Sequence, residues 1–186
     1  MTYAEIMADA KGRMEKALDH LKDMLKVIRT SRASTGLVEH IRMDYYGTPT
    51  PLGQLASISI PEPRQILIKP FDPSVLSDVT KALLKSDLGI TPESDGKVVR
   101  LNLPALSGDQ RKKYAAKVRE ICEESRIALR NVRRDLNKHA DALRKSSEIT
   151  DDENHQLHDE IQKLLKQYED KVGEVQEKKS AEIMEV

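Results

Sequence analysis

All eight prolines of this 186-residue chain lie between residues 49 and 104. Proline lacks the backbone N–H of a helix interior and clashes with the preceding turn, so this stretch cannot form one long helix. The proline-free segments on either side repeat apolar residues every three or four positions, as amphipathic helices do. The sequence therefore predicts long helices that flank a small segment of different architecture.

Three segments have this helical periodicity, namely residues 3–30, residues 108–147 and the chain after Ile149. The predicted buried stripes are Met14, Leu18, Leu21, Leu25 and Ile28 in the first, Val118, Cys122, Leu129, Val132, Leu136, Ala140 and Leu143 in the second, and Leu157, Ile161, Leu164, Tyr168, Val172 and Val175 in the third. Each segment far exceeds the mean helix length of about 11 residues and must bury its stripe on a neighbour. A short connection before a predicted capping box of Thr150 and Glu153 makes the last two helices antiparallel. We expect an elongated antiparallel three-helix bundle.

Residues 31–107 predict a small α/β domain inserted into this bundle, which gives an α+β fold. Strands are expected at residues 41–46, ended by Gly47-Thr48-Pro49, at residues 55–60 and 65–69, and where Val99, Leu101 and Leu103 alternate. One helix is expected to begin with Asp72 as its cap and Pro73 at its first position, and to stop at Gly89. The bundle domain then comprises residues 1–30 and 108–186.

The chain crosses between the two predicted domains twice, and both crossings are rich in small residues. We expect a two-strand hinge of limited flexibility formed by Ser31, Ser34, Gly36, Pro104 and Ser107.

The charges are balanced overall but divided between the last two helices. The chain has 31 basic and 31 acidic residues. Residues 108–147 hold 12 basic and 6 acidic side chains, whereas residues 148–186 hold 5 and 12. A zero net charge therefore conceals one basic and one acidic helix, and such local patches select binding partners.

Arginines gather on one side of the basic helix. At about 100° per residue, an arc of roughly 60° holds Arg119, Arg126, Arg130 and Arg133, with Arg134 just outside. Arginine favours bidentate contacts with phosphate or carboxylate, and Arg29 and Arg32 at the end of the first helix could extend the basic set. Because no aromatic residue is interleaved to stack on bases, structured RNA fits this surface better than single strands. The alternative is that these arginines only pair with acids on the third helix, as in a charged coiled coil.

The sequence contains no recognisable catalytic or metal-binding motif. There is no glycine-rich phosphate loop, GxSxG or HExxH motif. The single cysteine, Cys122, excludes an internal disulfide and belongs to an apolar stripe, while His155 and His158 suit a solvated helix face. Tyr45 and Tyr46 are expected to pack on the small sheet. We expect no cofactor, metal, small-molecule substrate or membrane span.

Four strings, read in order, make the chain resemble the ribosome recycling factor family over essentially its whole length: IRTSRAS at residues 28–34, YYGTPTPL at 45–52, SDLG at 86–89 and ALRNVRRD at 128–135. The resemblance implies an L-shaped molecule in which the bundle carries an inserted β/α/β domain. It also implies a non-catalytic, monomeric translation factor of the cytoplasm. Such a factor binds ribosomal RNA of the large subunit and, with elongation factor G and GTP, splits post-termination ribosomes and releases mRNA and deacylated tRNA. The competing hypotheses are a coiled-coil adaptor without ribosome binding and an enzyme built on the small domain.

The resemblance also implies which residues contact RNA. The family's RNA-contacting arginines match Arg29, Arg32, Arg130 and Arg133, of which Arg130 and Arg133 are the expected anchors. Arg126 and Arg134 join them through their place on the helix. One departure is Ser31, where the family usually has glycine. Serine is unfavourable there only if the position needs a positive φ or a close approach of RNA.

Overall fold

The computed structural model describes residues 2–185 and divides into two compact units. A helical unit holds the residues up to Leu25 together with Ala116–Ser180. A second unit holds Lys26–Ala115 and the described residues from Ala181 onward. Each unit has its own core, so each is described by itself.

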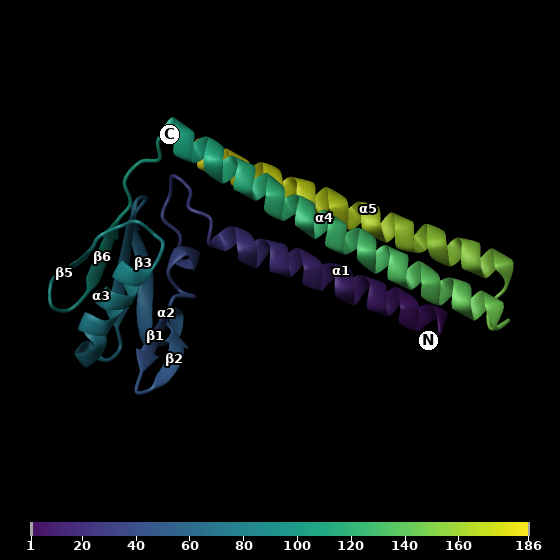
Figure 1. Ribbon diagram of the computed structural model, residues 1–186, viewed down its shortest axis with the longest axis horizontal. Coiled ribbons are helices and arrows are strands. Elements are labelled where there is room, and N and C mark those ends of the chain that lie inside the picture. The colour runs from purple at the N-terminus through teal and green to yellow at the C-terminus, as the bar shows by residue number, and fades with distance from the viewer. Residues whose placement is uncertain (1, 186) are drawn as a thin grey trace. The chain divides into compact units, whose positions relative to one another are not determined.

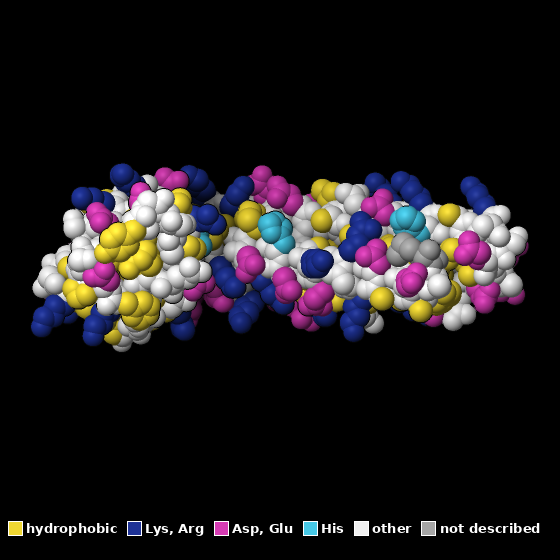
Figure 2. Space-filling view, turned by 90° about the horizontal axis from the view of Figure 1, so that it is seen from below, with side chains coloured by type: hydrophobic (Ala, Val, Ile, Leu, Met, Phe, Trp, Pro, Cys, Tyr) yellow, Lys and Arg dark blue, Asp and Glu magenta, His cyan; other side chains and the backbone are white. Residues whose placement is uncertain are grey.

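The helical unit is built on three helices that lie side by side (Figure 1), namely α1 (Tyr3–Lys26), α4 (Gly108–Lys145) and α5 (Asp151–Met184). Most residues of their predicted apolar stripes are buried in its core, and Ile6 and Ala10 extend the stripe of α1 towards its start. Ile28 is also buried but lies beyond the end of α1 in the second unit, and Val175 on α5 is only half-buried. On α5, Leu165 is buried and Leu164 is half-buried, so the stripe shifts by one residue from the prediction. On the face drawn in Figure 2, basic and acidic side chains are interspersed along these helices.

Helix α1 ends at Lys26, earlier than the predicted residue 30. In the segment that follows, the hydroxyl of Thr30 donates to the carbonyl of Arg32 at 3.1 Å and accepts from its N–H at 3.3 Å. Such short-range bonds from a threonine side chain compete with helical hydrogen bonding. The chain therefore leaves the helix before the arginine-containing segment.

The turn between α4 and α5 contains the predicted capping box. The backbone N–H of Glu153 donates to Thr150 Oγ1 at 3.2 Å, and the N–H of Thr150 donates to the Glu153 carboxylate at 2.7 Å. The bond from the backbone N–H of Thr150, together with one from its hydroxyl at 2.9 Å, lowers the pKa of Glu153. Ser147 adopts a φ of 59°, which closes the end of α4 in the left-handed conformation usual for helix C-termini.

The second unit combines two small sheets with short helices. Its elements are η1 (Thr35–Leu37), β1 (Arg42–Tyr45), β2 (Thr48–Pro51), α2 (Leu52–Leu55), β3 (Ala56–Glu62), β4 (Gln65–Pro70), η2 (Pro73–Val75), α3 (Leu76–Lys85), β5 (Pro92–Ser94) and β6 (Val99–Asn102). Strands β1 and β2 form an antiparallel hairpin, and the other four form an antiparallel sheet in the order β3-β4-β6-β5. Residues from the hairpin, the sheet and α3 share one apolar core.

The first predicted strand does end before Gly47, but Thr48 and Pro49 begin a second strand that was not predicted. Tyr46 and Gly47, with φ of 49° and 84°, form the turn, and β2 then pairs with β1 through Pro49 and Pro51. Two residues with positive φ match the twist of a tight hairpin. The turn also carries Tyr46 into solvent at 81% exposure, so the expectation that both tyrosines pack on the sheet is wrong for Tyr46.

Helix α3 begins and ends differently from the prediction in detail. Asp72 is the cap, because its carboxylate accepts from the N–H of Ser74 at 2.9 Å. The first turn after it, Pro73–Val75, is a 3-10 turn rather than α-helix. The helix ends at Lys85, before Gly89, because Ser86 is already extended. The glycine, at φ 63°, lies in the loop beyond.

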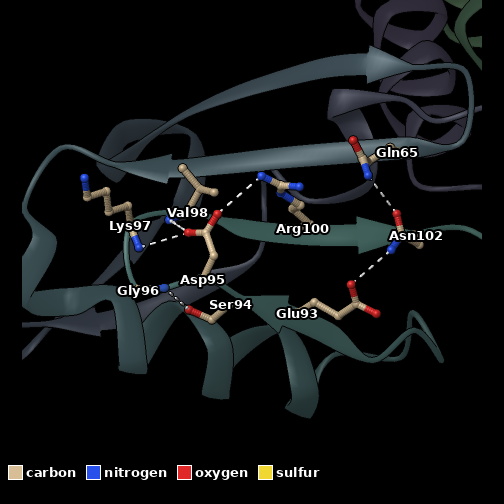
Figure 3. A network of polar contacts seen from close by, with 9 residues as sticks. All are labelled: Gln65, Glu93, Ser94, Asp95, Gly96, Lys97, Val98, Arg100 and Asn102. Atoms are coloured by element: carbon tan, nitrogen blue, oxygen red, sulfur yellow. Dashed lines mark hydrogen bonds and ion pairs between the residues drawn. The ribbon is translucent and has the colours of Figure 1, made fainter.

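Polar side chains connect the neighbouring strands β4, β6 and β5 of the larger sheet (Figure 3). Gln65 on β4 donates to Asn102 on β6 at 3.0 Å, and Asn102 donates to Glu93 on β5 at 3.3 Å. At the turn between β5 and β6, the backbone N–H groups of Val98 and Lys97 donate to Asp95 and lower its pKa. No helix within residues 2–185 is long and apolar enough to span a membrane.

Candidate nucleic-acid interface

The predicted arginines of α4 lie beside a row of hydrogen-bond acceptors on α5. The acceptors are spaced seven residues apart, so they share one face of that helix. Arg133 donates to Gln162 at 2.9 Å, Arg130 to Glu169 at 3.1 Å, and Arg126 to Gln176 at 2.9 Å. Because α4 and α5 are antiparallel, the arginine numbers rise as the acceptor numbers fall. We call Arg126, Arg130 and Arg133 the arginine row.

The three guanidinium groups of the row differ in how far carboxylates neutralise them. Arg130 contacts two, Glu169 on α5 and Glu123 on its own helix at 3.2 Å, and the bond to Glu169 is the main cause that raises its pKa. Arg126 contacts Glu123 at 3.3 Å and is more enclosed than Arg130, with 23% of its side chain exposed against 42%. Arg133 has the neutral Gln162 as its partner, and among residues 2–185 no carboxylate pairs with it.

Arg119 and Arg134 lie on the exposed surface of α4 and form no ion pair within the part of the chain that the structure describes. Together with Arg133, they leave charge available to an external anion. Of Arg119, Arg126, Arg130, Arg133 and Arg134, only Arg130 pairs with an acid of α5 within residues 2–185, so the alternative that these arginines only pair with acids of the third helix applies to that residue.

The acids that contact the row were missed by reasoning from the sequence. Glu123 stands three residues before Arg126 and seven before Arg130, a spacing that places it on the same helix face and that was readable in advance. Glu169 was not readable, because its place opposite Arg130 depends on how the turn at residues 146–150 sets the register of α5.

Arg29 and Arg32 lie in the second unit and have different surroundings. Arg29 is only 9% exposed and donates to the carbonyl of Pro104 at 2.6 Å, so it ties together the two predicted crossing segments. Arg32 is exposed and pairs with Glu185 at 2.5 Å. An anion can reach Arg32 more readily than Arg29 in this conformation.

Ser31 is buried and donates its hydroxyl to the carbonyl of Glu185 at 2.5 Å. Among residues 2–185, the non-glycine residues with positive φ are Tyr46 and Ser147. Serine at position 31 therefore carries no backbone strain. Its hydroxyl instead satisfies a carbonyl at the C-terminal end of α5, where helices leave four carbonyls without partners.

The other predicted hinge residues also fall inside the second unit. Ser34 caps η1 by accepting from Gly36, and Ser107 caps α4 by accepting from Gln110 at 3.2 Å. A Cβ atom added to Gly36 would lie 3.0 Å from the Cβ of Lys26, which explains why a residue without a side chain stands there.

Cys122 is buried in the helical core, where desolvation raises its pKa. A thiol held protonated in this way is a poor nucleophile. His158 lies 3.2 Å from Asp141, but no group of three or more metal-ligating side chains gathers within residues 2–185.

The sequence of this chain was compared with protein-family models and with known proteins. A family model described as "Ribosome recycling factor" matches residues 21–184. The chain is 47% identical over 182 residues to the ribosome-recycling factor of Syntrophobacter fumaroxidans, covering 98% of both chains, and 43% identical over 181 residues to that of Syntrophus aciditrophicus, covering 97% and 98%.

Solved structures agree with these relatives. A solution structure of ribosome recycling factor matches with a TM-score of 0.79 at 35% identity, covering 100% of this chain and 99% of the other. Models of the T. thermophilus ribosome recycling factor and the E. coli elongation factor G bound to the E. coli post-termination complex match with a TM-score of 0.71 at 34% identity over both full chains. The fold and its basic helix thus define a non-catalytic translation factor. The chain belongs to the ribosome recycling factor family.

Proposed function

We propose that this protein recycles ribosomes after termination. It binds the post-termination ribosome and, with elongation factor G and GTP, promotes separation of the subunits and release of mRNA and deacylated tRNA. The observation that carries this proposal is the 47% identity to a ribosome-recycling factor over 98% of both chains. The structure that holds a recycling factor and elongation factor G on the post-termination complex supports the same partners for this chain.

The α4 surface is the proposed contact with ribosomal RNA of the large subunit. Arg133 and Arg130 anchor it, and Arg126 and Arg134 flank them. Arg29 and Arg32, which belong to the second unit, are also proposed as RNA contacts. Support comes from the placement of Arg133, which keeps its charge beside a neutral glutamine, and of Arg134, which is exposed. Phosphate contacts of this kind release counterions and make binding weaken as salt rises.

The two units have different proposed tasks. The long helices give a stiff body that transmits force, while the inserted domain predicted at residues 31–107 moves on the hinge formed by Ser31, Ser34, Gly36, Pro104 and Ser107. Elongation factor G hydrolyses GTP and supplies the motion. The protein itself acts as a monomer in the cytoplasm and needs no cofactor.

Light scattering of post-termination ribosomes tests this function. Mixing with this protein, elongation factor G and GTP should lower the scattering as subunits separate, and omission of any component should abolish the change. Arg133→Ala should weaken the effect, whereas Arg100→Ala, which removes an arginine from strand β6 of the larger sheet, should leave large-subunit binding unchanged. Scattering that stays constant with active elongation factor G, and no co-sedimentation with large subunits, would contradict the proposal.

A further inference from the structure

Of the three α5 side chains that accept from the arginine row, only Glu169 is charged, and its hydrogen bond to Arg130 does not require that charge. Gln162 and Gln176 each accept from an arginine at 2.9 Å through a neutral amide oxygen. Glu169 occupies the same position of the seven-residue repeat and accepts from Arg130 at 3.1 Å. A glutamine at position 169 would offer the same acceptor at the same reach, so the negative charge is not needed to hold the arginine.

The negative charge of Glu169 lowers the positive electrostatic potential at Arg130, in the middle of the arginine row. Arg130 contacts two carboxylates, Arg126 contacts one, and Arg133 contacts none within residues 2–185. Exposed charges attract any polyanion, and this attraction makes up essentially all of the non-specific affinity for nucleic acid. A carboxylate placed on Arg130 therefore lowers the attraction for every RNA that approaches the row.

An RNA surface that fits the row can overcome this carboxylate. Phosphates that reach Arg133 and Arg134 directly bring a further phosphate close to Arg130, where a bidentate contact replaces the partly exposed ion pair with Glu169. RNA of unrelated shape makes fewer such contacts and meets the repulsion of Glu169 without compensation. Discrimination of this kind, through repulsion of wrong partners, is a common route to specificity.

We propose that Glu169 is a specificity-determining residue, whose carboxylate suppresses binding of unrelated RNA to the arginine row more than it suppresses binding of the large ribosomal subunit. The proposal rests on the RNA-binding function proposed for α4. Glu169 acts through Arg130 and is not itself an RNA contact.

The test compares Glu169→Gln with wild type and with Glu174→Gln, which removes the same charge from an exposed position on another face of α5. Affinity is measured for a short unrelated RNA duplex and for large ribosomal subunits at one fixed salt concentration. Glu169→Gln should bind the duplex about two- to fivefold more tightly, the range expected for an exposed ion pair, and should gain less on large subunits. Gln176→Glu, which adds an acid to the row, should weaken duplex binding by a similar factor.

Equal duplex affinities of Glu169→Gln and Glu174→Gln would overturn the proposal, because bulk charge alone would then explain the change. Weaker binding of Glu169→Gln to large subunits, with helicity unchanged by circular dichroism, would also overturn it and assign Glu169 to positioning Arg130. The duplex measurement does not depend on ribosomes. If the wild-type protein fails to bind large subunits, the proposed function is wrong. The comparison of duplex affinities between wild type, Glu169→Gln and Glu174→Gln still tests the role of Glu169.

Discussion

The phenolic oxygen of Tyr168 on α5 donates a hydrogen bond to the carboxylate of Glu15 on α1, across 2.5 Å. Tyr168 is buried, and the ammonium group of Lys171 lies 4.4 Å from the centre of its ring. Burial is the main cause that raises the pKa of Tyr168, to about 12, and the bond to Glu15 adds to it. The same bond lowers the pKa of Glu15. Two helices far apart in the sequence are thus joined by one charge-assisted hydrogen bond.

Tyr168→Phe removes this bond and keeps the ring. We expect the free energy of unfolding to fall by about 1 kcal/mol, the usual contribution of one hydrogen bond, because Glu15 can be rehydrated at the surface. Urea unfolding at pH 7 measures the change. An unchanged midpoint would show that the bond adds nothing to stability.

The same pair predicts a loss of stability in alkali. Because the folded pKa of Tyr168 is raised from its ordinary value of 10.0 to about 12, the folded state favours the protonated phenol. This contribution is fully present below pH 10 and is lost as the pH rises towards 12. Unfolding of wild type and Tyr168→Phe, followed from pH 8 to 12, should show their difference shrinking over that interval. A constant difference would contradict the raised pKa.

Ser31→Ala tests the hydroxyl contact with the end of α5. We expect the free energy of unfolding to fall by about 1 kcal/mol and the last amides of α5 to exchange hydrogen faster, because a carbonyl of Glu185 loses its donor. Ser31→Gly should show the same loss plus the effect of a more flexible unfolded chain. Identical exchange in wild type and both variants would remove any role for the hydroxyl.

Two glycines should respond in opposite directions to alanine. Gly47 has a φ of 84° in the hairpin turn, so Gly47→Ala should destabilise the protein by about 1 kcal/mol or more. Gly173 lies within α5, and a Cβ atom added there would enter open space, with no neighbouring side chain within 4 Å. Gly173→Ala should therefore stabilise the protein by about 0.5–1 kcal/mol. Thermal unfolding of both variants measures whether the melting temperature falls for Gly47→Ala and rises for Gly173→Ala. A change in the same direction for both would contradict this prediction.

Arg133→Ala and Arg126→Ala should differ in RNA binding. Arg133 lacks a carboxylate partner among residues 2–185, whereas Arg126 is enclosed and contacts Glu123. We expect Arg133→Ala to weaken large-subunit binding about tenfold and to reduce the dependence on log salt by roughly 0.7–0.9. Arg126→Ala should change both less. The reverse ranking, measured by co-sedimentation at several salt concentrations, would contradict the assignment of Arg133 as an anchor.

Long elements of this fold were predictable because each buries one continuous face. The stripes of α1 and α4 follow helical periodicity closely. The capping box was also predictable, because it depends only on the three-residue spacing of Thr150 and Glu153. Strand β2 was missed because prolines suggested a strand end. In a hairpin, however, every second residue has its N–H directed away from the partner strand, and Pro49 and Pro51 occupy those positions.

The arginines of α4 were also predictable, but their partners were not. Helical spacing fixes which residues of α4 share a face, whereas the pairing of Arg130 with Glu169 depends on the register of a second helix. The burial of Arg29 is a similar case, because its acceptor, Pro104, is 75 residues away in the chain. Contacts of this kind follow from tertiary structure and leave no periodic trace in the sequence.

The prolines of β2 also affect whether the exposed edge of the hairpin can pair with a strand of another molecule. With Pro49 and Pro51 on its outward side, the hairpin presents carbonyls there but no N–H groups from these two residues. An exposed strand edge with both donors and acceptors is a template onto which a second chain can add. The hairpin therefore ends in an edge that resists aggregation between copies, and the residues that hide this strand from sequence-based prediction are the ones that protect it.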